Sequence, residues 1–178
     1  MIDILIYVAI ALVLVVVALL AYAAARPDTF RVQRATGINA PAERIFPLIA
    51  NLKSMNTWNP FVEPDPAIKI AYSGPDSGRG AAHTWSGNSK VGEGRIEITD
   101  AAPSSRVAMR LDMHKPMKAH NAVEFTLAPN GNTTTVTWAM SGRQPFLAKL
   151  MTVFIDCDKM VGGQFEKGLG KLKAIAEA

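Results

Sequence analysis

The chain has few of the residues from which metal and redox sites are built. Its 178 residues include one cysteine, Cys157, and three histidines, His83, His114 and His120. A single cysteine cannot form an internal disulfide and has no partner for a CxxC motif, so a dithiol redox site is excluded. The histidines lack the spacing of metal ligands, and we therefore expect no metal site.

Motifs of common catalytic and nucleotide-binding sites are missing as well. Neither Ser73 nor Ser86 lies in a nucleophile elbow, and no glycine-rich phosphate loop opens a helix. Lysine and arginine are dispersed and do not alternate with aromatic residues, so nucleic acid is not an expected partner. No catalytic constellation and no cofactor are predicted, and His83 is the single candidate for an acid or base.

What the sequence does contain is a long apolar run without charge, glycine or proline, from Ile4 to Ala25. As a helix, its 22 residues would cross the roughly 30 Å hydrocarbon core of a bilayer. Tyr7 and Tyr22 lie near its ends, where aromatic rings prefer the membrane interface. A cleavable signal peptide is the alternative, because the final alanines could supply a cleavage site. The length of the run and the lack of a preceding basic residue favour a permanent anchor.

The residues that flank this helix predict its orientation. Asp3 precedes the run, whereas Arg26, Arg31 and Arg34 follow it. Because positive residues stay on the cytoplasmic side of a membrane, the rest of the chain is predicted to face the cytoplasm. We expect a single-pass protein with an anchor at 1–25, a short linker at 26–29 and one domain at 30–178.

The domain is predicted to have an α+β fold. Apolar alternation between Gly, Pro and Asn turns predicts seven strands, at 30–36, 68–72, 80–86, 91–99, 106–113, 120–127 and 136–141. Two short helices are expected after the first strand, the first starting at 41 and the second covering 52–57. A 3.6-residue period from 146 to 176 predicts a terminal helix whose apolar stripe, including Leu147 and Met151, packs on the sheet. Gly162-Gly163 should kink or break this helix.

A further set of motifs runs through the first half of the domain. It begins with Ile38-x-Ala40-Pro41-x-Glu43-x-Ile45-Phe46-x-x-Ile49 and Trp58-Asn59-Pro60, and continues with Gly78-x-Gly80, Trp85-x-Gly87 and Gly92-x-Gly94. With the helical ending, residues 29–177 resemble the polyketide cyclase/dehydrase-like proteins of the SRPBCC group, which have START-like (Bet v 1-like) domains. The resemblance implies a helix-grip fold, a curved antiparallel seven-stranded sheet around a long C-terminal helix. It leaves the function open, because this fold hosts carriers, receptors and cyclases.

The strand registers also predict which side chains face the inside of the sheet. That interior is rich in methionine and aromatic residues, which together suit a flexible apolar guest, although for each residue taken alone a packed core is the better explanation. Trp58 and Phe61 are expected near a mouth, and Asn121 is either a structural amide or a ligand contact. The predicted ligand-binding residues are Trp58, Phe61, His83, Trp85, Met109, Met113, Asn121, Phe125, Trp138, Met140 and Phe154.

Three functions follow from these features. The first is a membrane-anchored domain that binds a hydrophobic small molecule or lipid as a carrier, sensor or protector. The second is an enzyme of the cyclase or hydratase type that acts on an apolar polyketide or isoprenoid, with His83 in its site. The third is an interaction domain with a filled core. An internal cavity would separate the first two from the third.

Overall fold

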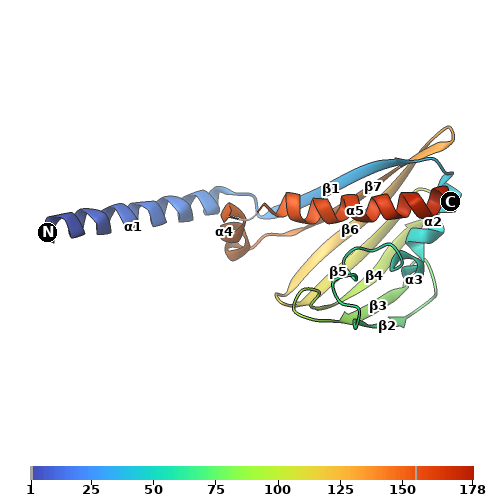
Figure 1. Cartoon of the computed structure of the whole chain (residues 1–178), viewed down its shortest axis with the longest axis horizontal. Helices are drawn as coiled ribbons and strands as arrows, with labels where there is room; N and C mark the ends of the chain where they lie inside the picture. Colours follow the sequence, from blue (N-terminus) through green and yellow to red (C-terminus); the bar gives the residue numbers. More distant parts are fainter. Residues whose placement is uncertain (1, 155) are drawn as a thin grey trace.

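The computed structural model describes residues 2–154 and 156–178, without the side chains of residues 2, 3 and 154. Helix α1 (Ile2–Ala25) projects from one end of an α+β body (Figure 1). Short helices α2 (Ala42–Ala50) and α3 (Leu52–Met55) follow the first strand. Helices α4 (Phe146–Phe154) and α5 (Cys157–Glu177) come after the last strand.

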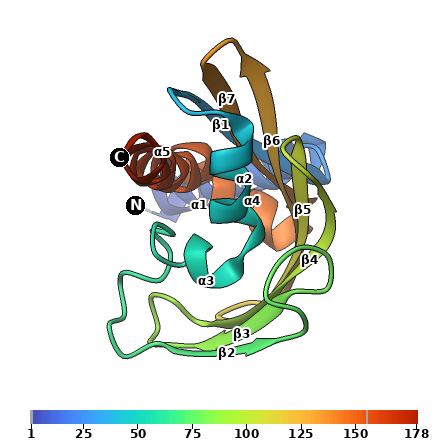
Figure 2. The same ribbon diagram turned by 90° about the vertical axis from the view of Figure 1, so that its right-hand side faces the viewer.

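The body is built on one antiparallel sheet of seven strands in the order β1-β7-β6-β5-β4-β3-β2. The sheet curls around α5 and α2 (Figure 2), which confirms the predicted α+β helix-grip architecture. The strands are β1 (Thr29–Ile38), β2 (Lys69–Ser73), β3 (Ala82–Ser86), β4 (Glu93–Ala102), β5 (Arg106–Lys115), β6 (Ala119–Asn130) and β7 (Thr133–Arg143).

The strand register brings several connections to the end of the sheet from which α1 projects. Thr29, the first residue of β1, pairs with Arg143 at the end of β7, and Asn121 near the start of β6 pairs with Gly142. The β5–β6 turn and the β7–α4 junction therefore lie at this end, which we call the anchor end (Figure 1). The β6–β7 turn lies at the opposite end.

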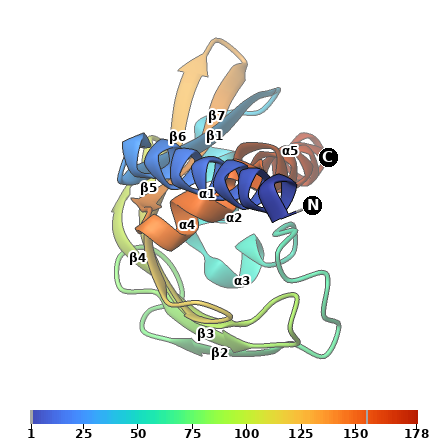
Figure 3. The ribbon, with the colours of Figure 1, turned by 90° about the vertical axis from the view of Figure 1, so that its left-hand side faces the viewer.

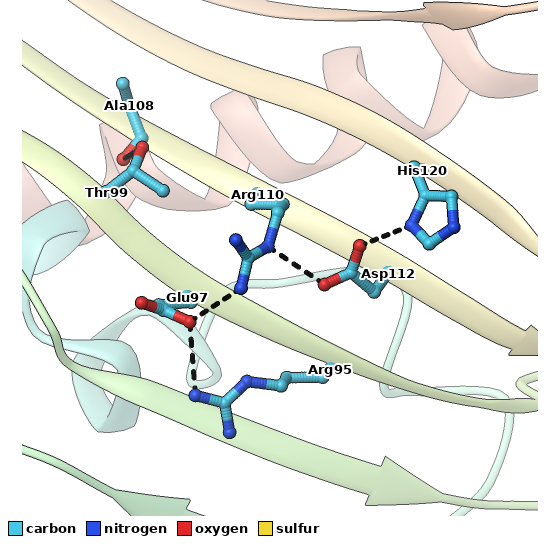
Figure 4. Close-up of polar contacts among 7 residues, drawn as sticks. All are labelled: Arg95, Glu97, Thr99, Ala108, Arg110, Asp112 and His120. Atoms are coloured by element: carbon cyan, nitrogen blue, oxygen red, sulfur yellow. Dashed lines mark hydrogen bonds and ion pairs between the residues drawn. The ribbon is translucent and has the colours of Figure 1, made fainter.

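The two faces of the sheet differ in chemistry. On the outer face, charged residues of β4, β5 and β6 form a chain of contacts from Arg95 through Glu97, Arg110 and Asp112 to His120 (Figure 4). The hydrogen bond from His120, and then that from Arg110, holds the pKa of the Asp112 carboxyl below its usual value. The inner face is apolar and packs against the helices.

Aromatic rings form the centre of the core between the sheet and α5. The rings of Trp138 and Phe165 stack with centroids 4.2 Å apart and an angle of 11° between their planes. Trp58 meets Trp138 and Phe125 edge-on, at 5.7 and 5.9 Å. Gly168 permits this packing, because a Cβ there would lie 2.7 Å from the Trp138 ring.

The predicted interruption of the terminal helix at Gly162-Gly163 is wrong. Helix α5 runs through both glycines. The predicted terminal helix is instead divided earlier, into α4 and α5. There the Asp156 side chain accepts a hydrogen bond from the Lys159 amide at 3.0 Å and caps α5. A local cap rather than glycine flexibility therefore sets the start of the final helix.

Gly162 has a different role, which is to admit a side chain from β1. A Cβ at Gly162 would lie 2.2 Å from Nη2 of Arg34. The Arg34 guanidinium passes over this glycine and pairs with Asp158 at 2.8 Å and Glu166 at 2.7 Å on α5. Arg34 therefore fastens the helix to the edge strand.

Candidate functional site

An apolar cavity of about 280 Å³ lies between the inner face of the sheet, the 59–68 loop and α5. Its wall is formed by side chains from β3 to β7, from α3, from the 59–68 loop and the β3–β4 turn, and from the first turns of α5. Seven of the predicted ligand-binding residues line it, namely Phe61, His83, Trp85, Met113, Asn121, Trp138 and Met140. The structure therefore brings these seven predicted residues together around one apolar cavity, and their binding of a ligand stays a prediction.

Three other predicted residues do not line the cavity. Trp58, Met109 and Phe125 are fully buried in the packed core. Trp58 is held there because its Nε1 donates a hydrogen bond to the Leu48 carbonyl at 3.0 Å. The prediction that Trp58 lies near a mouth is therefore wrong. Phe154 ends α4, and its side chain lies outside the described residues.

Several lining residues were absent from the predicted site. Ile96, Leu111 and Val123 lie on the inward strand faces, and Phe165 lies on the apolar stripe of the terminal helix, so sequence periodicity could have found all four. Lys90 lies in the β3–β4 turn. No periodic signal marks turn residues, and their place in the wall depends on how the turns fold.

Two of the segments that line the cavity, the 59–68 loop and the β3–β4 turn, are fixed to their surroundings. In the 59–68 loop, the buried Asp65 carboxylate accepts hydrogen bonds from the Asn88 amide at 2.7 Å and the Ala67 amide at 3.0 Å. The first of these joins the loop to the β3–β4 turn. Glu63 joins the same loop to α5 through Lys167 and Lys171. Phe61, which belongs to this loop, lines the cavity and is 41 % exposed.

Among the described residues that line the cavity, His83 is the only histidine, and it is only 4 % exposed. Its Nδ1 has no hydrogen-bond partner, and its Nε2 lies 3.4 Å from the Asn56 amide nitrogen. Tyr72 and Trp85 flank the ring, with centroids 5.5 and 5.9 Å away. Burial lowers the pKa of His83 to about 4, opposed only in part by the Thr84 backbone, so the ring is neutral at pH 7.

One further buried polar atom on a residue of the wall lacks a partner. Trp138 Nε1 is buried without an acceptor, whereas Nε1 of Trp85 donates to the Val91 carbonyl at 3.3 Å. Within the described residues, the half-buried Asn121 amide makes no side-chain hydrogen bond. Because buried polar groups are nearly always paired, unpaired atoms that border an apolar cavity indicate a place for a ligand or water.

The register shows where these groups lie across the sheet. His83 pairs with Ile96, Ile96 with Leu111, and Leu111 with Asn121. His83 and Asn121 therefore belong to one row and are separated by three strand spacings, about 14 Å along a flat sheet. The curvature of the sheet turns them toward a shared interior. Among the described residues, no group of His, Cys, Asp and Glu side chains has the arrangement of a metal site.

Residues 29–177 match the family described as polyketide cyclase/dehydrase and lipid transport. The chain belongs to this family. The match begins at the first strand, so α1 lies outside it. A comparison with curated proteins finds no match.

Solved structures with a similar fold come from several organisms. Norcoclaurine synthase from Thalictrum flavum, solved with dopamine and hydroxybenzaldehyde, has a TM-score of 0.62 at 10 % identity, over 83 % of this chain and 86 % of that one. A protein from Chromobacterium violaceum has a TM-score of 0.59 at 15 % identity, over 86 % and 99 %. The Aha1 dimer from Colwellia psychrerythraea has a TM-score of 0.58 at 18 % identity, over 83 % and 95 %. At these identities the likeness establishes the fold alone.

The helix outside the family match is long and apolar enough to span a membrane. Its apolar segment, Ile4–Ala25, has 22 residues and is largely exposed, with Ala23 buried near its end. Arg26 follows directly, with its guanidinium 5.1 Å from the centroid of the Tyr22 ring. A signal sequence near an N-terminus would have the same length and composition.

Proposed function

We propose that the protein is a membrane-anchored domain that binds a neutral, mainly apolar small molecule or lipid in its cavity. The single observation that carries this proposal is the apolar cavity with unpaired polar atoms in its wall. The family match, whose description includes lipid transport, agrees with it. Carriage, sensing and protection of the guest all require this binding step.

The size of the cavity limits the guest. An apolar cavity of roughly 150 Å³ is large enough to bind benzene. The cavity here, at about 280 Å³, is close to twice as large and suits a molecule of two fused rings or a short branched chain. A longer lipid chain would extend through the mouth past Phe61 toward solvent or bilayer.

The chemistry of the wall indicates a guest without a formal charge. A neutral His83 offers no cation to a carboxylate, and an unpaired ion would be costly in so apolar a space. Lys90, the basic residue among those that line the cavity, is exposed in the β3–β4 turn, so its charge is solvated at the edge of the site. His83 Nδ1 and Trp138 Nε1 can each exchange a hydrogen bond with a hydroxyl or carbonyl of the guest. The expected ligand is therefore apolar with one or two uncharged oxygen groups.

Membrane anchoring supplies the reason for such a site. The α1 segment supports a single-pass anchor, and the arginines that follow it favour a cytoplasmic domain. Three residues that line the cavity, Trp85, Met113 and Asn121, lie toward the anchor end of their strands. A guest that concentrates in the bilayer would have a short route to the cavity.

Binding can be tested on the full chain in lipid nanodiscs. Small molecules retained by the purified protein are extracted with organic solvent and identified by mass spectrometry. Met113→Trp fills the cavity, whereas Met160→Trp makes the same change on the exposed surface of α5. We expect a retained compound in the wild type and in Met160→Trp and its loss in Met113→Trp. Equal retention by both variants, or none by the wild type after exposure to lipid extracts, would contradict the proposal.

The hydrogen-bonding role of Trp138 has its own matched test. Trp138→Phe removes an unpaired donor, whereas Trp58→Phe removes a donor that is bonded to Leu48. Loss of a ligand hydrogen bond worth about 1 kcal/mol would weaken binding about fivefold in Trp138→Phe. Trp58→Phe should instead mainly lower the free energy of unfolding, because it leaves the Leu48 carbonyl without this hydrogen-bond donor. Unchanged affinity in Trp138→Phe would remove this residue from the site.

An enzymatic role is supported by one specific observation, the neutral and unpartnered nitrogen of His83 in the cavity wall. Such a nitrogen can accept a proton from an apolar substrate, as a cyclase or hydratase would require. If a compound identified above is converted, His83→Gln should abolish turnover and leave binding within a few-fold of wild type. The filled-core interaction domain has no such support, because the cavity is far larger than a water site.

A further inference from the structure

Helix α4 has the reverse of the polarity that a helix shows on a water-soluble protein. Its outward side presents Phe146, Leu147 and Met151, which are 47 %, 63 % and 43 % exposed. Its inward side carries Lys149, which is 5 % exposed, and Thr152. The prediction that Leu147 and Met151 pack on the sheet is therefore wrong. We call the three outward residues the α4 face.

The inward polar side of α4 is bound to the segment that follows α1. The Arg26 guanidinium donates hydrogen bonds to the carbonyl and hydroxyl oxygens of Thr152 at 2.9 and 2.8 Å. Lys149 pairs with Asp28 at 2.5 Å and holds the pKa of that carboxyl below its usual value. Gln144 also donates to the Thr152 hydroxyl, at 3.1 Å. These bonds account for the inverted helix by satisfying its buried polar groups.

The same bonds fix the position of α4 along the axis of α1. Arg26 is the first residue after the apolar segment, so the Thr152 oxygens lie at the level where α1 ends. Figure 3 shows α4 directly beside α1 at this end of the body, and Figure 1 places it between α1 and α5. The α4 face therefore continues the apolar surface of α1.

We propose that the α4 face lies in the boundary between headgroups and acyl chains of the bilayer that α1 spans. This inference rests on the membrane anchoring proposed above. Amphipathic helices of this kind lie in the plane of the interface with their apolar side toward the acyl chains. The occupant is the bilayer rather than another protein, because the face is continuous with α1 and is held at the level of its end. Exposed Arg143 beside the helix adds a cation suited to lipid phosphates.

A second contact is provided by the β5–β6 turn. Met117 in this turn is largely exposed and is followed by the exposed Lys118. The turn lies at the anchor end of the sheet, as α4 does (Figure 1). Two separate contacts would fix the tilt of the domain as well as its distance from the membrane, and would hold the anchor end of the cavity against the lipid.

Site-directed fluorescence on the full chain tests the inference. In a Cys157→Ser background, single cysteines are placed by Leu147→Cys, by Met117→Cys and, as a control at the far end of the sheet, by Asn130→Cys. Each is labelled with an environment-sensitive dye, and the protein is reconstituted into vesicles of phosphatidylcholine and phosphatidylglycerol, with and without nitroxide-labelled lipid. We expect blue-shifted emission and several-fold stronger lipid quenching at 147 and 117 than at 130.

The outcomes separate this inference from the proposed anchor. Alkaline extraction of the same vesicles measures anchoring alone, and release of the protein would overturn both proposals. Retention of the protein with water-like emission at 147 would overturn only the α4 contact. A blue shift at 147 without quenching by nitroxide lipid would also overturn it, because the face would then be covered by protein, such as a second copy.

Discussion

Acidification from pH 7 to pH 4 should destabilise the protein through His83. This imidazole is buried in the cavity wall, where burial lowers its pKa from 6.5 to about 4. Protonation would place a charge beside Trp85 and Tyr72, with no carboxylate bonded to it among the described residues. His83 therefore binds a proton more weakly in the folded protein than in the unfolded chain.

The sign and size of the effect follow from the two pKa values. Between pH 6.5 and about 4 the unfolded chain binds more protons at this site than the folded protein, so stability falls as the pH falls. The stability is fully present above pH 6.5 and its loss is complete near pH 4. At about 1.4 kcal/mol per pKa unit, the total is about 3 kcal/mol. That is a large part of the roughly 5–15 kcal/mol that stabilises a typical domain.

The assay compares the wild type with a variant that cannot titrate at this position. Full-length protein in nanodiscs is unfolded with urea at several pH values between 7 and 4, and tryptophan fluorescence reports the folded fraction. His83→Gln removes the titration, while the acidic groups of the outer face contribute equally to both proteins. The difference between the two stability curves should change by about 3 kcal/mol across this pH range.

An independent measurement can refute the reasoning directly. Carbon-13 labelling of the histidine rings gives a titration curve for each ring by NMR, and His83→Gln identifies the resonance of His83. A transition near pH 6.5 would mean that the ring is solvated and that the cavity wall is not as the structure describes it. Parallel stability curves for wild type and variant would lead to the same conclusion.

Two further predictions concern the attachments around the cavity. Gly162→Ala should lower the free energy of unfolding, because its Cβ would displace the Arg34 guanidinium, whereas Gly163→Ala, which faces open space, should raise it by about 0.5–1 kcal/mol through helix propensity. Urea unfolding of both variants checks this, and equal effects would contradict the role assigned to Gly162. Asp65→Ala should release the 59–68 loop from the Asn88 amide, costing about 1–3 kcal/mol and speeding release of a bound guest. Stopped-flow measurement of guest release checks the second effect, and an unchanged rate would mean that the loop does not control the mouth.

The strands were predictable because their information is local. Alternation and turn residues mark them, and the chain turns between β6 and β7 at Gly131, whose φ is +61°. The inward direction of His83 also follows from its alternation with the neighbouring residues of β3. Local pattern is sufficient here because one face of the sheet is apolar and the other is charged.

The division between core and cavity was not predictable in the same way. Trp58 and Trp138 are both buried aromatic residues, yet only Trp138 borders the cavity. Whether an aromatic ring packs in the core or lines the cavity depends on the fit of side chains from distant elements, here α2, α5 and the 59–68 loop. Sequence periodicity gives the side of a strand on which a residue lies and carries no information about this fit.

The inverted polarity of α4 was missed for a related reason. Its apolar residues follow the helical period, and periodicity alone assigns such a stripe to the core. The side that is buried is decided by Lys149 and Thr152, whose partners Asp28 and Arg26 precede the first strand. A pairing between residues so far apart in sequence leaves no local signal, so the stripe was assigned to the wrong side.

The register of the sheet decides whether the anchor and the cavity can serve one function. β7 has 11 residues, so its two ends are about 36 Å apart at roughly 3.3 Å per residue. A mouth at the β6–β7 end would require a guest to cross that distance of water after it left the bilayer. The cavity residues Asn121 and Met113 instead lie near the start of β6 and the end of β5. This is the end of the sheet at which β1 follows α1. Under the proposed function, a hydrophobic guest would exchange one apolar environment for another over a short path, and an anchor at this end of the sheet would keep that path short.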